Sequence, residues 1–388
     1  MEYKTMKKIF LITLEYPPQI GGIATYTHEL AKTLSSSHTV LVLAPRFHNK
    51  AGQEEWDSHV PYSVMRKQLF FPRILWPRWL PLLWHAFRIA KKEHVHLFMI
   101  HHVLPSGYVA KILKKFLHIP YVVFFHGADI TSAKSTRLWK QKMIRFVAKT
   151  ADGLVVNSEP IKKRLHQILR DEERAIQVLY PCVDAAFFDP PAQEALTELK
   201  RRYALNGKRV LLSVSRIGEG KGFPHLARML PAILRAIPNA VWVVVGDGPK
   251  KDALVAYVEQ HGLQNAVRFI GALTPNDVKP LYYLADAFIL LNHFDLERGE
   301  EGFGIVFLEA AGAGLPVIAG RTGGVEEAVL HTETGLIVDA YQERDVLAAI
   351  TTILQNPEYG KRLGDHARAR AQAEFAWAKQ VKKLDQWL

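Results

Sequence analysis

The chain has 388 residues, of which 48% are hydrophobic, with 50 Lys and Arg against 38 Asp and Glu and a single Cys. This composition excludes a disordered chain, a collagen and a disulfide scaffold. Cys182 alone can form neither an internal disulfide nor a Cys-rich zinc site. At about 150 residues per domain, the length predicts two or three globular units.

The positive charge is concentrated in the first half of the chain. Residues 1–185 contain 27 Lys and Arg against 14 Asp and Glu, whereas 186–388 contain 23 against 24. A basic half suggests a polyanionic partner or a generally basic surface. The apolar run 8–14 is too short for a signal peptide, and charges or prolines interrupt longer apolar stretches. We therefore predict a cytoplasmic protein, soluble or peripheral on the inner face of the cytoplasmic membrane.

Apolar runs rich in Val, Ile, Leu and Phe alternate with helical segments along the chain. Continuous apolar runs are typical of parallel strands that are buried on both faces. The predicted strands are 8–14, 39–45, 96–102, 121–127, 153–158, 209–215, 240–246, 268–273, 287–292, 316–320 and 335–339, and the helices include 24–34, 137–149, 223–236 and 306–313. This βαβ rhythm occurs twice, which predicts an α/β protein with two Rossmann-like, doubly wound parallel-sheet domains facing each other across a cleft.

A proline-rich stretch at 178–193 separates the two series and is predicted to be an interdomain linker. We therefore expect domains at 1–185 and 186–374. Residues 375–388 have the pattern of an amphipathic helix. Ligands of such domains bind at the carboxyl ends of the strands, where the strand order reverses.

The most informative segment for function is 300–320. A flexible turn, Gly302–Phe303–Gly304, leads into a helix that begins near Ile305, and the free N–H groups of a helix start suit phosphate oxygens. Glu301 precedes the turn, and Glu309 lies about one turn into the helix, so both carboxylates can face the same site. Two solvated carboxylates are the alternative.

A second candidate segment is 211–223, where a strand ends at Arg216 and a Gly-rich loop presents Lys221. Two cations at the carboxyl end of a parallel strand can bind a diphosphate. The loop resembles a Walker A motif, but Gly222 stands where Ser or Thr would hold magnesium, which excludes an ATPase. A merely solubilising basic loop remains the alternative.

In the first half, the pair Gly21–Gly22 follows the first strand and suits close approach of a ligand or of the other domain. It does not match the Gly-x-Gly-x-x-Gly pattern of nicotinamide binding, which counts against a dehydrogenase. His126 ends a buried strand just before a glycine and is a candidate ligand contact or a structural histidine.

No metal or other cofactor is expected. The histidines at 94, 96, 101 and 102 have no zinc-enzyme spacing, and the chain contains no Asp-x-Asp. We therefore expect diphosphate charge to be neutralised by Arg216, Lys221 and backbone N–H groups.

Residues 58–92 contain seven Lys or Arg and no acidic residue, interleaved with aromatic side chains. This combination suits an anionic membrane interface or an acceptor groove more than nucleic acid, and the alternative is a helix packed on the first domain. The candidate membrane or acceptor residues are Arg73, Trp76, Arg78, Trp79 and Trp84.

The chain resembles the retaining glycosyltransferases of group 1, in family four with the GT-B fold. The resemblance rests on an ordered set of motifs: YPPQIGG (16–22), FFHG (124–127), SR with GKGF (215–223), VVVGDGP (243–249), RFIGAL (268–273), the segment 301–329 and TGLIVD (334–339). Pro181–Cys182–Val183–Asp184 departs from the Asn-Gly-Val-Asp common in the family. The long loop 293–302 resembles that of phosphatidylinositol mannoside mannosyltransferases and favours a GDP-mannose-type donor over a UDP-sugar.

The resemblance implies a role for each matching residue. Arg216 and Lys221 would bind the donor diphosphate, Glu309 the ribose, and Glu301 the sugar hydroxyls. Residues Phe303, Gly304, Ile305 and Val306 would offer backbone N–H groups to sugar and phosphate. The backbone from Gly271 to Leu273 would hold the base, His126 would lie beside the transferred sugar, Gly21 and Gly22 would face the diphosphate, and the helix around Trp377 would pack on the first domain.

These implications together predict a metal-independent hexosyltransferase. It would move a hexosyl group, mannose being the favoured one, from a GDP- or UDP-sugar to a lipid-linked or glycan acceptor with retention, with His126, Glu301, Arg216 and Lys221 as the catalytic set. Two alternatives are a nucleotide-sugar epimerase or hydrolase on the same fold and a non-enzymatic membrane-binding protein. Turnover without acceptor would indicate the former, and a broken donor site the latter.

Overall fold

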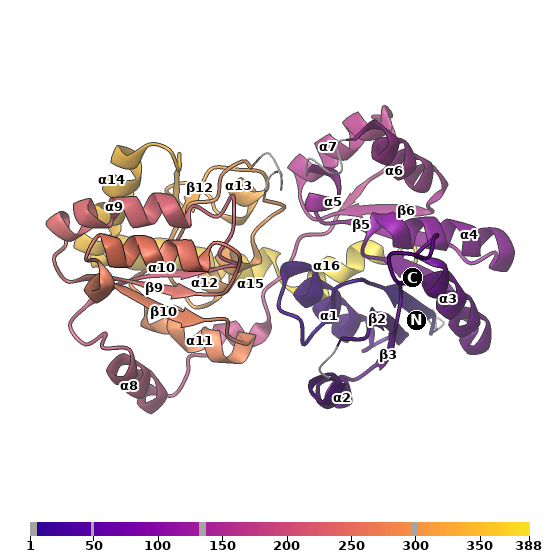
Figure 1. Ribbon diagram of the computed structural model, residues 1–388, viewed down its shortest axis with the longest axis horizontal. Helices are drawn as coiled ribbons and strands as arrows, with labels where there is room; N and C mark the ends of the chain where they lie inside the picture. Colours follow the sequence, from indigo (N-terminus) through magenta and orange to yellow (C-terminus); the bar gives the residue numbers. More distant parts are fainter. Residues whose placement is uncertain (1–5, 48–49, 132–136, 296–298, 300) are drawn as a thin grey trace. The chain divides into compact units, whose positions relative to one another are not determined.

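The computed structural model describes residues 6–47, 50–131, 137–295, 299 and 301–388. The chain forms two α/β units (Figure 1). The first unit comprises Met1–Pro181 together with Trp377–Leu388, and the second comprises Cys182–Ala376. The sequence analysis placed these divisions at 185/186 and 374/375.

The first unit contains a seven-stranded parallel sheet with the strand order β3-β2-β1-β4-β5-β6-β7. Its strands are β1 (Lys8–Ile12), β2 (Thr39–Pro45), β3 (Ser63–Lys67), β4 (Leu97–Ile100), β5 (Tyr121–Phe125), β6 (Gly153–Val156) and β7 (Gln177–Val178). Its helices are α1 (Gly22–Leu34), α2 (Lys50–Ser58), α3 (Leu80–Glu93), η1 (Val103–Gly107), α4 (Tyr108–Leu117), α5 (Ala128–Thr131), α6 (Leu138–Thr150), α7 (Glu159–Leu169), α16 (Trp377–Gln380) and η4 (Val381–Leu384).

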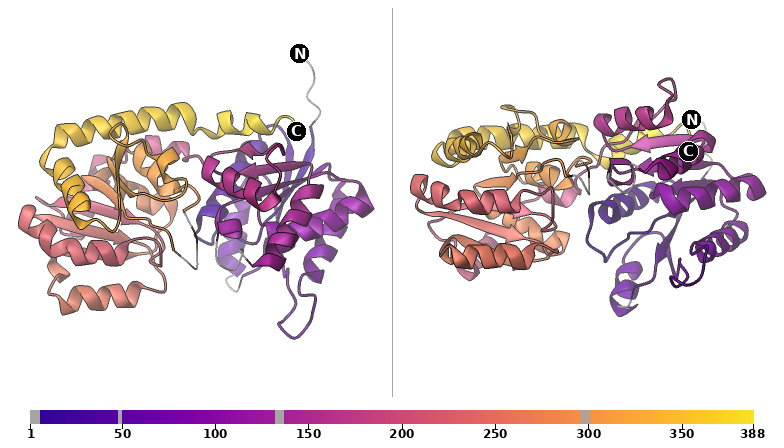
Figure 2. Two further views of the ribbon diagram at one scale, coloured as in Figure 1. Left: turned by 90° about the horizontal axis from the view of Figure 1, so that it is seen from above. Right: turned by 45° about the horizontal axis from the view of Figure 1, so that its top comes forward.

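The strand order of this unit places helices on both faces of the sheet. From β1 the chain moves outward to β2 and β3, returns to β4, and then moves the other way to β7. Because crossovers between parallel strands are right-handed, helices of the two directions cover opposite faces. Accordingly, α3 packs against α4 and α4 against α6, while α16 lies against α1 (Figures 1 and 2).

The second unit contains a six-stranded parallel sheet with the order β10-β9-β8-β11-β12-β13. Its strands are β8 (Arg209–Val214), β9 (Ala240–Val245), β10 (Val267–Gly271), β11 (Ala287–Leu290), β12 (Val317–Gly320) and β13 (Gly335–Val338). Its helices are η2 (Ala185–Phe188), α8 (Gln193–Arg202), α9 (Phe223–Ala236), α10 (Lys251–Gln260), η3 (Gln264–Ala266), α11 (Pro275–Leu284), α12 (Ile305–Gly312), α13 (Val325–Ala328), α14 (Glu343–Gln355) and α15 (Pro357–Glu374).

The continuous apolar runs form central strands, as predicted. All six residues of β9 are buried, and so are all five of β5. Every predicted strand is present, so the predicted fold class of two doubly wound parallel sheets is confirmed. The sequence analysis missed β3 and β7, which lie at the two edges of the first sheet.

The prediction of one continuous amphipathic helix at 375–388 is wrong. Phe375 packs on Phe303 of the second unit, with ring centroids 5.5 Å apart, and only α16 and the short 3₁₀ helix η4 follow it. Both belong to the first unit. There Trp387 fills the space beside Gly153, where an added Cβ would lie 2.4 Å from the Trp387 ring. The predicted return of this segment to the first domain is therefore correct.

Candidate functional site

The predicted donor residues of the second unit follow two adjacent strands. Arg216 and Lys221 come after β8, and Glu301 comes after β11, which is the neighbour of β8 in the sheet. The chain moves from β8 to β9 on one side, and β11 lies on the other, so the strand order reverses at this point. Ligands of open α/β sheets bind at the carboxyl ends of strands at such a reversal.

Lys221 and Glu301 form an ion pair, in which Lys221 Nζ donates a hydrogen bond to Glu301 Oε2. Asn292 Nδ2 donates to the same oxygen at 2.8 Å. Burial by itself raises the pKa of Glu301, but Lys221 and the N–H groups of Gly302 and Phe303 outweigh it, so the pKa lies below its ordinary value. The two predicted residues are thus brought together, and Glu301 is ionised at neutral pH.

Two glycines give this part of the site its close packing. Gly222 has a φ of +72°, and an added Cβ would lie 2.3 Å from the carbonyl oxygen of Leu291. Gly304, with a φ of +89°, precedes the first residue of α12, and an added Cβ would lie 2.5 Å from the Phe307 ring. Only glycine adopts these conformations without strain. The predicted turn into α12 is therefore present, and the N–H groups of its first turn follow Glu301 directly.

Glu309 lies in α12, and its carboxylate Oε2 accepts a hydrogen bond of 2.6 Å from the hydroxyl of Tyr282 in α11. Burial raises the pKa of Glu309 to about 7, although the Tyr282 hydrogen bond opposes the shift. Burial and the neighbouring Glu309 raise the pKa of Tyr282 well above its ordinary value. The Glu309 carboxylate is held near the point of changing protonation state at neutral pH.

Arg216 is exposed just beyond the end of β8. Gly271 ends β10 with a φ of +88°, and its carbonyl accepts a hydrogen bond from the N–H of Gly246, which follows β9. Leu273 is half-buried two residues further on. Because the sheet is parallel, all these positions lie at the same edge as Lys221 and Glu301.

In the first unit, His126 follows β5 and belongs to a packed histidine cluster. Its Nε2 lies 3.3 Å from Nδ1 of His101, and the two rings are stacked with centroids 5.5 Å apart. The edge of Tyr26 packs on His126 at 5.0 Å, and Trp377 of the C-terminal segment packs on Tyr26 at 5.1 Å. His126 is thus held by His101, which follows β4, and by Tyr26 of α1, which Trp377 of α16 supports.

The stacked His101 and His126 are both neutral at physiological pH. Burial and the nearby His102 lower the pKa of His126 to about 3, and burial and His126 lower that of His101 well below its usual value. Asp129 accepts hydrogen bonds from the N–H groups of His126 and Gly127, while burial raises its pKa to about 6. A neutral imidazole can both donate and accept a hydrogen bond, as recognition of a sugar hydroxyl requires.

Gly21 precedes α1 in an extended conformation that any residue can adopt. An added Cβ would have one atom within 4 Å, the Glu15 Oε2 at 3.5 Å. Packing within the first unit therefore does not require glycine at this position. The role predicted for Gly21 and Gly22, close approach to a diphosphate, remains a prediction.

Sequence reasoning missed Asn292 and Tyr282, which hold Glu301 and Glu309, and His101, which contacts His126. Asn292 carried a usable signal, because a polar residue directly after a buried strand points to the ligand-binding edge of the sheet. Tyr282 and His101 carried none, since their contacts depend on the tertiary structure. Residues 296–298 and 300 of the loop 293–302 lie outside the described residues.

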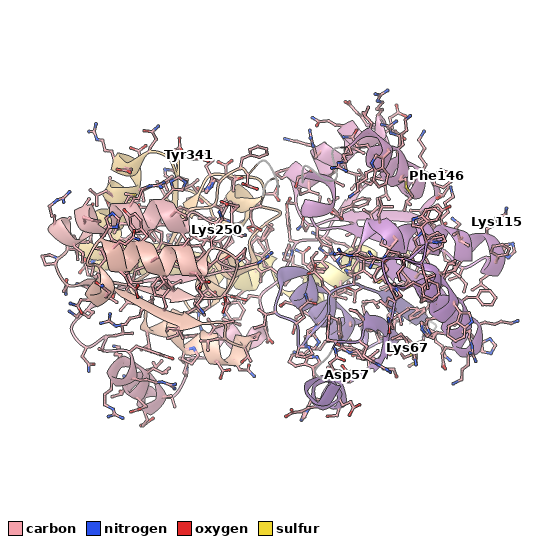
Figure 3. The ribbon with its side chains drawn as sticks, viewed as in Figure 1. Asp57, Lys67, Lys115, Phe146, Lys250 and Tyr341 are labelled. Atoms are coloured by element: carbon pink, nitrogen blue, oxygen red, sulfur yellow. The ribbon has the colours of Figure 1, made fainter. Side chains whose placement is uncertain are left out.

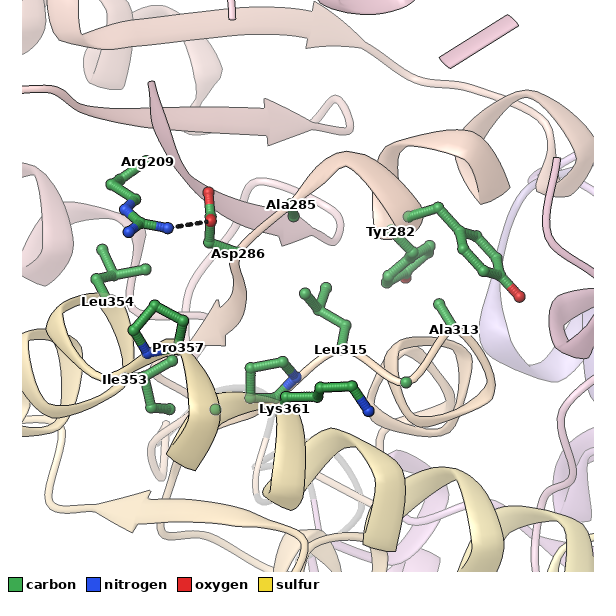
Figure 4. Close-up of a pocket in the computed structure, with 14 residues that line it drawn as sticks. Arg209, Tyr282, Ala285, Asp286, Ala313, Leu315, Ile353, Leu354, Pro357 and Lys361 are labelled. Carbon is green, nitrogen blue, oxygen red and sulfur yellow. Dashed lines mark hydrogen bonds and ion pairs between the residues drawn. The ribbon is translucent and has the colours of Figure 1, made fainter. Parts of the chain in front are cut away.

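A pocket in the second unit lies elsewhere. It is lined by residues that include Arg209 at the start of β8, Asp286 just before β11, and Lys361 in α15 (Figure 4). Arg209 Nη1 and Asp286 Oδ1 form an ion pair at 3.0 Å. This pocket is at the amino ends of the strands, opposite the edge that carries Lys221 and Glu301.

Comparisons with known proteins identify the family of the chain. The family model described as "Glycosyl transferases group 1" matches residues 197–370, and that described as "Glycosyltransferase Family 4" matches 20–187. A GDP-mannose-dependent alpha-(1-6)-phosphatidylinositol monomannoside mannosyltransferase of Mycobacterium tuberculosis is 28% identical, covering 99% of this chain and 98% of the relative. A glycogen synthase of the same species is 25% identical, over 95% and 91%.

Among solved structures, HepE of Anabaena in complex with UDP has a TM-score of 0.81 and 21% identity, covering 98% of this chain and 99% of the other. A sucrose-phosphate synthase from Thermosynechococcus elongatus gives the same TM-score and identity, over 98% of each chain. These neighbours support the GT-B fold. With the motifs, the two matched models and the donor-edge geometry in agreement, the chain belongs to the group 1 glycosyltransferases of family 4.

Proposed function

We propose that this glycosyltransferase moves a hexosyl group from a nucleoside diphosphate sugar to a lipid-linked or glycan acceptor with retention of configuration and without a metal ion. The observation that carries the proposal is the Lys221–Glu301 pair at the start of α12, where the strand order reverses. A cation, a carboxylate and a helix N-terminus in one place match a phosphorylated sugar. Mannose, with GDP as the nucleotide, is the favoured donor because the mannosyltransferase relative is GDP-mannose-dependent.

The reaction places its developing charge on the leaving diphosphate. When the bond between the sugar and the diphosphate breaks, fixed positive groups that already face the diphosphate lower the barrier. Arg216, Lys221 and the N–H groups at the start of α12 supply these groups. Glu301 would leave Lys221 to the phosphate and accept hydrogen bonds from sugar hydroxyls, and Glu309 would accept them from the ribose.

The acceptor hydroxyl must lose a proton as the new glycosidic bond forms. No described side chain at the donor edge is placed as an evident nucleophile, so we propose transfer on the same face, with the leaving phosphate oxygen taking that proton. His126, as a neutral imidazole, would hold a hydroxyl of the transferred sugar. This arrangement balances the charge without a covalent enzyme intermediate.

The test is a thermal-shift screen with GDP, UDP and their sugars in the presence of a metal chelator. A ligand that binds the folded state raises the melting temperature. We expect stabilisation by one nucleotide, loss of that shift in Lys221→Ala, and retention of it in the control Lys208→Ala, which changes an exposed lysine of the same unit. If no nucleotide stabilises the wild type, the proposal fails.

A second assay identifies the reaction. Release of nucleoside diphosphate should require an acceptor, and the anomeric configuration of the product, read by NMR, should equal that of the donor. Donor turnover without any acceptor would instead indicate an epimerase or hydrolase, and an inverted product would contradict retention.

A further inference from the structure

The helical face of the first unit that carries α3, α4 and α6 exposes an unusual number of large apolar side chains. They extend well beyond the segment that the sequence pointed to. We call this set the basic aromatic face, and its apolar members are Ile74, Leu75, Trp76, Leu80, Trp84, Phe116, Leu138, Trp139 and Phe146. Trp76 is 85% exposed and Ile74 92%. Exposed apolar groups gathered in one region mark an interaction surface.

Ring contacts join the three helices into one surface. Trp79, just before α3, packs on Tyr108 of α4 with centroids 5.2 Å apart, and Tyr108 lies 6.5 Å from Phe146 of α6. Lys111 of α4 lies over the Phe146 ring at 2.8 Å. Trp79 is therefore a support beneath the surface, whereas Trp76 and Trp84 belong to the surface itself. Figure 3 shows Phe146 and Lys115 at the edge of this unit.

The charge around these side chains is mostly positive, although Lys114 of α4 forms an ion pair with Asp152. Residues 58–151 contain 16 Lys and Arg and only two acidic residues, Glu93 and Asp129. Asp129 faces the histidine cluster, where it accepts hydrogen bonds from backbone N–H groups. Cations stand beside exposed rings: the exposed Arg88 lies 4.8 Å from the Trp84 ring, and the half-buried Lys140 lies 5.6 Å from the Trp139 ring.

The charge decides which partner fits. A second copy of the chain in a symmetric dimer would place this basic face against itself, and the charges would repel. A lipid bilayer satisfies both features, because Trp and other apolar side chains enter the interface between headgroups and acyl chains while Lys and Arg meet anionic headgroups. A surface of this kind binds a membrane without a spanning segment. No helix in the described part of the chain is long and apolar enough to cross a membrane.

We infer that the basic aromatic face binds an anionic lipid bilayer. The inference rests on the proposed function in one respect: a lipid-linked acceptor lies in such a bilayer, which is why the enzyme would bind there. It widens the predicted segment 58–92 to include α4 and α6, whose residues lie far from it in sequence. It also removes Trp79 and Arg78 from the direct contacts, because Trp79 is half-buried and Arg78 Nε donates a hydrogen bond to the Phe71 carbonyl oxygen.

The test is flotation of the full chain with vesicles of phosphatidylcholine alone and of phosphatidylcholine mixed with phosphatidylglycerol. We expect binding to the mixed vesicles only, weakened about tenfold both in Lys115→Glu/Lys142→Glu and in Ile74→Ser/Trp139→Ser. These positions are exposed, so the variants should fold normally. The matched control Lys200→Glu/Lys208→Glu makes the same charge change in the second unit and should bind like the wild type.

Three results would overturn the inference: no binding of the wild type to mixed vesicles, equal losses in the control and the test variants, or binding to DNA in place of vesicles. The nucleotide thermal shift of each variant is measured alongside. A wild type that responds to nucleotide but not to vesicles refutes this inference and leaves the proposed function standing. A wild type that binds mixed vesicles but does not respond to nucleotide refutes the proposed function and supports membrane binding by the basic aromatic face.

Discussion

The two units share one architecture but handle charge in opposite ways. The second unit has nearly equal numbers of acidic and basic residues and holds half-buried carboxylates with partners, Glu301 with Lys221 and Glu309 with Tyr282. The first unit is strongly basic, keeps His101 and His126 neutral and leaves rings and cations exposed. This difference in charge is what we expect if the second unit binds a small charged ligand, as proposed, and the first presents a binding surface, as inferred.

The largest effect should come from breaking the charge pair of the second unit. Lys221→Ala removes the cation proposed to bind the diphosphate and leaves Glu301 without its charge partner. We expect kcat/KM for sugar transfer to fall by roughly 10²–10³ and the unfolding free energy by about 1–3 kcal/mol, because both side chains are partly exposed. Steady-state kinetics and urea unfolding measure the two losses.

The double variant Lys221→Met/Glu301→Gln separates these two losses. It removes both charges, so it should recover most of the stability and none of the activity. Activity that returned together with stability would show that Lys221 has only a structural role.

In the first unit, His126→Ala should slow transfer and leave nucleotide binding intact. Loss of one hydrogen bond to the transferred sugar predicts a fall in kcat of roughly tenfold to a hundredfold. The thermal shift with nucleotide should match that of the wild type, since Lys221, Glu301 and Glu309 are all in the second unit. A lost nucleotide shift would mean that His126 acts on the donor diphosphate instead.

His101→Phe is the matched test of His126 positioning. It keeps a ring on Phe124, with which His101 stacks at 4.5 Å, and removes only the contact to His126. We expect a smaller fall in kcat than for His126→Ala, with KM for the donor unchanged. An effect confined to thermal stability would limit His101 to packing.

The pH dependence of stability should reveal Glu309. Its pKa is raised from 4.5 to about 7 in the folded state, so the folded protein holds a proton there that the unfolded chain releases. This contribution to stability is present below about pH 4.5 and is lost as the pH rises to 7, a change of roughly 3 kcal/mol. Glu309→Gln should not show that loss of unfolding free energy. Urea unfolding at about pH 5 and about pH 7.5, on either side of the raised pKa, measures the difference.

Tyr282→Phe should sharpen this result. The Tyr282 hydroxyl lowers the pKa of Glu309, so its removal should move the transition to higher pH. A pH profile identical in the wild type, Tyr282→Phe and Glu309→Gln would show that Glu309 does not titrate in this range.

The smallest effect separates exposed from buried apolar residues in the first unit. Trp76→Ala should change the unfolding free energy by less than about 0.5 kcal/mol because its side chain is exposed. Leu82→Ala, two residues into α3 and fully buried, should cost about 2–5 kcal/mol. Urea unfolding of both variants checks this contrast, and a comparable loss in Trp76→Ala would mean that the ring packs internally.

The sequence by itself determined the two sheets and the edge at which we propose that the donor binds. Runs such as 121–127 and 240–246 are apolar on both faces, which only a buried parallel strand tolerates, and the glycines around 302–304 mark the turn that begins α12. The two edge strands of the first sheet, β3 and β7, escaped this reasoning, whereas the edge strands β10 and β13 of the second sheet did not. β3 has the sequence SVMRK, which contains no apolar run that predicts a strand, and its residues are at most partly buried.

Only the tertiary structure decided which side chains meet. Lys221 reaches Glu301 from the end of another strand, 80 positions away in sequence, and Tyr282 reaches Glu309 from another helix. Neighbouring strands of a parallel sheet, and the helices that join them, are far apart in sequence. The same holds for the basic aromatic face. Composition identified the segment 58–92 as a candidate surface. In the folded chain Trp79 packs on Tyr108, whereas Trp139 and Phe146, which lie outside that segment, are exposed. Exposure is a property of the folded chain rather than of the residue type.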